Sequence, residues 1–112
     1  MPEINSPDIL SLLQRLRASR LPFNLQLVAR IVDLAAAFAD DYEGRQISAG
    51  SLSGLIDYLE ASPLVGKPDL TLTPSGDCYA EWRHPQAGKS VIEFSNSGMA
   101  HCWSENLQSE GA

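Results

Sequence analysis

Three segments in the first 62 residues carry apolar side chains at every third or fourth position, which is the spacing of one face of an α-helix. They run from Pro7 to a stop before Pro22, from Leu25 to about Tyr42, and from Ser51 to Ala61. The residues expected to face inward are Ile9, Leu12, Leu13, Leu16, Leu27, Val28, Ile31, Val32, Leu34, Ala35, Phe38, Ala39, Leu52, Leu55, Ile56 and Leu59. The pattern predicts three amphipathic helices that share a core.

Residues that favour helix ends bound these segments. Ser6 and Pro7 favour a helix start, and Asn24 is suited to cap the second helix. Gly44 is expected to take the left-handed conformation that ends the second helix. Gly54 predicts a close helix contact or a frayed start in the third helix.

The hydrophobic period changes to two after residue 69, and turn residues interrupt it at Pro74-Ser75-Gly76 and at Ser95-Asn96-Ser97-Gly98. Alternation broken by such turns is typical of β-hairpins, and Gly76 and Gly98 are the positions where a positive φ is expected. The pattern predicts four antiparallel strands connected as a meander.

The face of each strand that is buried depends on the register between strands. We expect Trp82 to be buried, because the alternative would bury Glu81 and Arg83. Pairing of Phe94 with Met99 would place His101 and Trp103 on the same face as Ser90, Ile92 and Phe94. The connection after His84 then requires a β-bulge near that residue.

Together these elements predict an α+β fold in which three N-terminal helices pack on one face of a four-stranded antiparallel meander. The 112 residues, 44% of them hydrophobic, are enough for one domain with its own core. We expect a helical part over 6–62, a connector over 63–69, the meander over 70–103 and a disordered tail over 104–112.

The chain has a formal net charge of −6, which argues against binding to nucleic-acid phosphates. A helix-turn-helix made of the second and third helices would present Asp57 and Glu60 and no basic side chain. No apolar run approaches the length needed to cross a membrane, and no export signal precedes the first helix. We therefore expect a cytoplasmic protein that binds neither nucleic acid nor a membrane.

Residues that could carry chemistry are few. Cys78 and Cys102 fall inside predicted strands, where a cysteine is more often inert packing than a nucleophile. His101 and Cys102 are adjacent in a strand and point to opposite faces, so they are poorly placed to chelate one ion. We expect no metal, no cofactor and no catalytic group.

Aromatic and charged residues in two places are the candidate partner-binding residues. In the meander they are Tyr79, Glu81, Arg83, His101 and Trp103, and at the end of the second helix they are Asp40, Asp41 and Glu43. Trp103 is either an exposed anchor or part of the core. The three acidic residues lie at the unfavourable end of the helix dipole, either because they have a use or because that end is simply solvated.

The C-terminal third resembles a meander that recurs in small uncharacterised accessory proteins of bacteria and mobile elements. The resemblance is carried by Thr73-Pro74-Ser75-Gly76, Ala80-Glu81-Trp82, Gly88, Val91-Ile92-Glu93-Phe94 and Gly98. It implies an accessory role, such as neutralising or modulating a partner protein, and implies no catalytic residue.

The favoured hypothesis is a non-enzymatic protein-binding module, an acidic inhibitor or antagonist of a partner with a basic surface, of the toxin-antagonist or phage-inhibitor type. The alternative is a small-molecule-binding or catalytic domain with a pocket between helices and sheet, lined by His84, His101, Tyr79 and Glu81. A homodimer through an edge strand is a third hypothesis.

Overall fold

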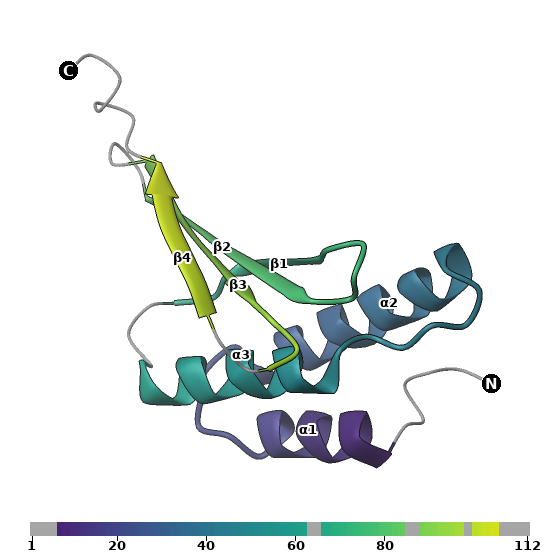
Figure 1. Cartoon of the computed structure of the whole chain (residues 1–112). Coiled ribbons are helices and arrows are strands. Elements are labelled where there is room, and N and C mark those ends of the chain that lie inside the picture. The colour runs from purple at the N-terminus through teal and green to yellow at the C-terminus, as the bar shows by residue number, and fades with distance from the viewer. Residues whose placement is uncertain (1–6, 63–65, 85–87, 98–99, 106–112) are drawn as a thin grey trace.

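Three helices precede a four-stranded antiparallel sheet, which confirms the predicted α+β class (Figure 1). The computed structural model describes residues 7–62, 66–84, 88–97 and 100–105. The helices are α1 (Pro7–Arg17), α2 (Asn24–Asp41) and α3 (Ala49–Ala61). The strands are β1 (Asp69–Leu72), β2 (Cys78–His84), β3 (Gly88–Phe94) and β4 (Ala100–Glu105), in the spatial order β1-β2-β3-β4.

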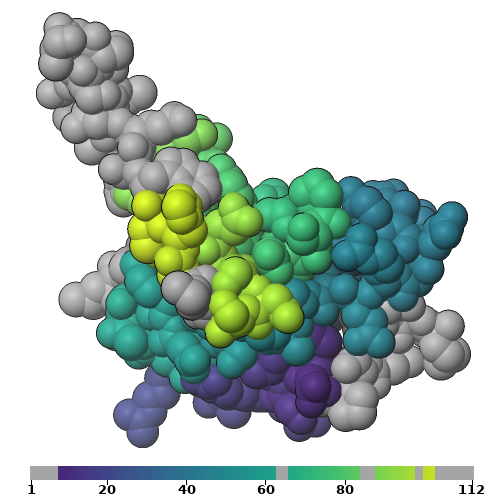
Figure 2. Space-filling view, viewed as in Figure 1, coloured from purple at the N-terminus to yellow at the C-terminus, as the bar shows by residue number. Residues whose placement is uncertain are grey.

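The helices cover one face of the sheet. Helix α2 contacts β1, α3 contacts β2 and β3, and α1 packs against α2 and α3. The space-filling view shows β4 (yellow) and the end of β3 (yellow-green) above α3 (teal), with α1 (purple) on the other side of α3 (Figure 2). The shared core contains Leu16, Leu27, Ile31, Leu52, Leu55, Ile56, Leu59, Leu70, Cys78, Ala80, Trp82, Ile92 and Phe94.

Two of the predicted helix boundaries are wrong. Asn24 is the first residue of α2 and not its cap: its side-chain amide donates to the carbonyls of Arg17 and Ser19, so it holds the end of α1 against the start of α2. Helix α3 begins two residues earlier than predicted, because the Ser48 hydroxyl caps it by accepting from the Ser51 amide at 3.1 Å. The predicted cap at Ser6 lies outside the described residues.

The C-terminal end of α2 is followed by two left-handed residues, where the sequence predicted one. Gly44 has a φ of +83°, as expected, but Glu43 before it is left-handed too, with a φ of 57°. The Gly44 amide donates to the Ala39 carbonyl at 2.7 Å, and this bond satisfies one of the last free carbonyls of the helix. A non-glycine residue therefore occupies a left-handed position there.

Helix α3 is fastened to the sheet at its first turn. A Cβ atom added to Gly50 would lie 1.7 Å from the Asn96 carbonyl oxygen, so only glycine allows this approach. The fully buried Ser51 hydroxyl donates to the Phe94 carbonyl and accepts from the Cys78 amide at 2.7 Å. The first turn of α3 therefore packs directly against the turn that follows β3.

The strand register corrects two predictions and confirms a third. Phe94 pairs with Ala100 and not with Met99, so the last turn spans five residues instead of four. Trp82 pairs directly with Ser90 and His84 with Gly88, so no bulge is needed near His84. Trp82 is buried, as predicted, and its indole N–H donates to the Gly66 carbonyl at 3.0 Å.

The limits of the sheet also differ from the prediction. Strand β1 begins at Asp69, which was placed in the connector, and β4 continues through Ser104 and Glu105, which were placed in a disordered tail. Gly76 has the expected positive φ, at +86°. The predicted turn glycine at Gly98 and the tail over 106–112 lie outside the described residues.

Candidate functional site

One face of the sheet is not covered by any of the helices α1 to α3, and the strand register determines which residues lie there. Alternation from the buried residues of β1, β2 and β3 assigns every second position to this outer face. Its members are Asp69 and Thr71 in β1, Tyr79, Glu81 and Arg83 in β2, Lys89, Val91 and Glu93 in β3, and His101, Trp103 and Glu105 in β4. The five residues singled out from the meander therefore share one face.

For His101 and Trp103 this placement is a correction. The predicted register put both beside Ser90, Ile92 and Phe94, whereas His101 lies opposite Glu93 and Trp103 opposite Val91. A shift of one residue in the turn moves every side-chain position of β4 to the other face. His101 is exposed, and Trp103 is placed by its backbone register on the outer face, away from the helix–sheet core.

Glu81 is a carboxylate on the outer face that lies between two basic side chains. Its side chain is only 14% exposed, its Oε2 lies 2.8 Å from Arg83 Nη2, and its Oε1 lies 3.9 Å from Lys89 Nζ. The approach of Arg83 does not have hydrogen-bond geometry, so Oε2 is a buried oxygen without a hydrogen bond among the described residues. Burial of a carboxylate costs free energy, which the two basic neighbours offset.

Val91 lies beside Glu81 and forms the apolar centre of the outer face. It is fully buried although it faces away from the helices, and it is not part of the helix–sheet core. Tyr79 is half-buried on the same strand as Glu81. The outer face therefore carries charged and aromatic side chains around a valine that the chain itself already covers, and aromatic side chains are enriched where proteins dock.

The acidic residues at the end of α2 form a separate group. Asp40, Asp41 and Glu43 are exposed at the C-terminal end of the helix, and Arg45 stacks over the ring of Tyr42 at 5.8 Å. Figure 1 places this end of α2 on the opposite side of the molecule from β4. The structure does not bring the two predicted groups into one site.

The two cysteines differ in environment. Burial raises the pKa of Cys78 to about 12, against the lowering effect of a hydrogen bond with Ser51, so its thiol stays protonated and unreactive. Cys102 is exposed on the helix-facing side of β4. Within the part of the chain that the structure describes, no three His, Cys, Asp or Glu side chains lie close enough to hold a metal ion.

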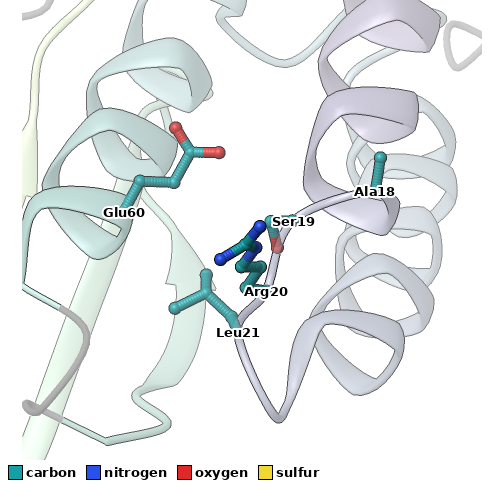
Figure 3. A pocket seen from close by; sticks show the side chains of 5 residues that line it. All are labelled: Ala18, Ser19, Arg20, Leu21 and Glu60. Atoms are coloured by element: carbon teal, nitrogen blue, oxygen red, sulfur yellow. The ribbon is translucent and has the colours of Figure 1, made fainter.

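A cavity of about 410 Å³ lies where the α1–α2 connection meets the end of α3 (Figure 3). It is lined by Ala18, Ser19, Arg20, Leu21 and Glu60, and Glu60 also pairs with Arg15 at 2.5 Å. The pocket hypothesis named other residues. Tyr79, Glu81 and His101 lie on the outer face, so they cannot line a pocket between helices and sheet.

Sequence reasoning missed Val91, Lys89 and Ser51. Val91 and Lys89 could have been found from the period of two through Glu93, once the pairing with Glu81 was known. Ser51 carries no such signal, because a serine in the first turn of a helix is ordinarily a solvated residue.

Searches for matching families, curated proteins and solved structures found no match for this chain. None of the helices in the described residues has the length and apolar character of a membrane span.

Proposed function

We propose that this protein is a non-enzymatic binding module that docks another protein on the outer face of its sheet. The observation that supports this best is Glu81, a carboxylate only 14% exposed that is paired with Arg83 and Lys89 on a face that none of α1 to α3 covers. A lysine or arginine of a partner would join these two basic groups around the carboxylate. Half-buried Tyr79 on the same strand supplies apolar area for the contact.

The partner is proposed to present a basic surface. Acidic positions on the outer face outnumber basic ones; they are Asp69, Glu81, Glu93 and Glu105, against Arg83 and Lys89. The whole chain carries a net charge of −6, so long-range attraction would speed association with a basic protein. Occlusion of a nucleic-acid-binding surface in the cytoplasm, as an inhibitor or antagonist, is the form of activity that this charge favours.

Two variants and one matched control test the proposal. Tyr79→Ala and Glu81→Gln alter the outer face, and Gln14→Ala alters an exposed residue of α1 on the far side of the helices. Each protein is immobilised and used for capture from the source cell at low and high salt, after thermal melting has shown that all three are folded.

The wild type and Gln14→Ala are expected to retain the same basic protein, and Glu81→Gln to lose about tenfold or more of it, the usual effect of removing a charge at an interface centre. High salt should weaken capture of that protein by the wild type. Equal capture by all three variants, or capture of nothing by the wild type, would contradict the proposal.

A second candidate function is small-molecule binding, which the cavity at Arg20 and Glu60 favours. Figure 3 shows the two side chains reaching into the same space from the α1–α2 connection and from α3. Opposite charges on the wall of a small cavity suit a zwitterionic ligand such as an amino acid. Chemical-shift changes in these residues on titration with free amino acids, absent in Arg20→Ala, would support this function, and unchanged spectra would exclude it.

A further inference from the structure

The two edges of the sheet are protected to different degrees. Strand β1 has only four residues, lies between Pro68 and Pro74, and its Leu70 carbonyl accepts a hydrogen bond from Arg30 Nε of α2 at 3.1 Å. Strand β4 has six residues and contains neither proline nor lysine. Prolines, lysines, short length and covering side chains are the means by which proteins block an edge strand, so β1 is blocked, whereas none of these means is found at β4 among the described residues.

Strand β4 also projects beyond the helix layer. Ile92 in β3 is buried under the helices, whereas its neighbour in β4, Cys102, is exposed, and Ala100 is exposed as well. Ala100, Cys102 and Ser104 occupy the helix-facing side of β4, and none of them is charged. A strand added at this edge would therefore meet no buried charge on that side.

We propose that the occupant of this edge is a second copy of the chain, with the two β4 strands antiparallel and the two sheets joined into one of eight strands. The sequence of β4 is complementary to itself in this direction. Antiparallel neighbours share a face, and the symmetric registers that pair the most residues of β4 are centred on Cys102 or on Trp103. Centring on Trp103 places His101 opposite Glu105 in both halves of the pair, where an imidazole N–H can donate to the carboxylate, whereas centring on Cys102 places His101 opposite Trp103.

The Trp103-centred register has a second consequence for β4. Cys102 of one copy comes to lie opposite Ser104 of the other, twice in each dimer. The dimer would place both outer faces on the same side of the joined sheet, so docking of a partner protein does not compete with it. Self-association does not depend on the function proposed above, and purified protein alone is enough to test it.

The first test is the mass in solution measured by light scattering over a range of concentrations. The wild type is expected to rise from the 12.2 kDa of one chain to twice that mass. Cys102→Lys, which puts a charge on the open edge, is expected to stay monomeric, and Thr71→Lys, at an exposed position of the blocked edge, to dimerise as the wild type does. A wild type that is monomeric throughout, or a Cys102→Lys variant that still dimerises, overturns the proposal.

The second test is disulfide formation, which reports the register. Ser104→Cys, in which Cys102 is retained, is expected to form an intermolecular disulfide about tenfold faster than Gln14→Cys, because pairing raises the effective concentration of the facing thiols. The wild type, with Cys102 two positions out of alignment, should cross-link more slowly than Ser104→Cys. Wild-type cross-linking as fast as that of Ser104→Cys overturns the register.

Discussion

Ser51 is the residue on which the attachment of α3 to the sheet depends most directly. It is fully buried, and its hydroxyl joins three elements by donating to the Phe94 carbonyl of β3 and accepting from the Cys78 amide of β2. Replacement of Ser51 by alanine removes both bonds and leaves two backbone groups without partners in the core. The helix itself would not suffer, because alanine is the better helix former.

The magnitude follows from the two orphaned groups. Leaving one buried donor or acceptor unpaired costs about 1 to 3 kcal/mol, so Ser51→Ala is expected to lower the free energy of unfolding by about 2 to 6 kcal/mol. That is a large part of the roughly 5 to 15 kcal/mol that holds a small domain folded. The loss should appear as a lower urea midpoint with an unchanged slope, measured by circular dichroism and by the fluorescence of the buried Trp82.

Ser53 provides the matched control for this experiment. It lies on the same helix, is half-exposed, and has no side-chain hydrogen bond among the described residues. Ser53→Ala should change the free energy of unfolding by no more than about 0.5 kcal/mol. If Ser51→Ala lost less than about 1 kcal/mol, or no more than Ser53→Ala, the hydroxyl would not be the link between helix and sheet, and the reasoning would be refuted.

Three further changes test other parts of the structure. Gly50→Ala should cost about 2 kcal/mol or more in urea unfolding despite the helix preference of alanine, because the added methyl group meets a backbone carbonyl that cannot swing away; an unchanged midpoint would show that the contact is loose. Glu43→Gly should gain up to about 1 kcal/mol by relieving the left-handed φ and removing a negative charge from a helix C-terminus, and a lower melting temperature would contradict this. Between pH 9 and 12 the folded state keeps the Cys78 proton that the unfolded chain loses, so stability that is full below pH 9 should fall by up to about 1.4 kcal/mol per pH unit; Cys78→Ala should lack this component of the slope, and identical slopes would argue against it.

Helices and strands were predictable because their signals are local. The apolar spacing through α2 and the turn at Gly76 each depend on neighbours within a few residues. Boundaries were less accurate where two capping residues compete. Asn24 has the chemistry of a cap but serves α1 by donating to the carbonyl of its last residue, Arg17. Ser48 does cap α3, but the glycine at the second position of that helix is a weak helix former.

The candidate site was predicted in part. Tyr79, Glu81 and Arg83 were assigned to the exposed side of β2 by the cost of burying charge, and the structure confirms that they lie away from the core. His101 and Trp103 were assigned to the wrong side because the prediction made the last turn one residue too short. The sequence did not indicate how far Asp40, Asp41 and Glu43 lie from β4, because separation along the chain does not report distance in space.

The sequence by itself determined which segments are helices and which are strands, because apolar residues recur with a period of 3.6 in the first and 2 in the second. It also determined that the strands form a meander packed against a helical layer. Only the tertiary structure decided that Glu81 is nearly buried beside Val91, that Ser51 links α3 to two strands, and that β1 is blocked by Arg30 while β4 is open. Each of these joins residues at least ten positions apart in the chain. Such contacts arise from packing of the whole domain, which no local pattern records.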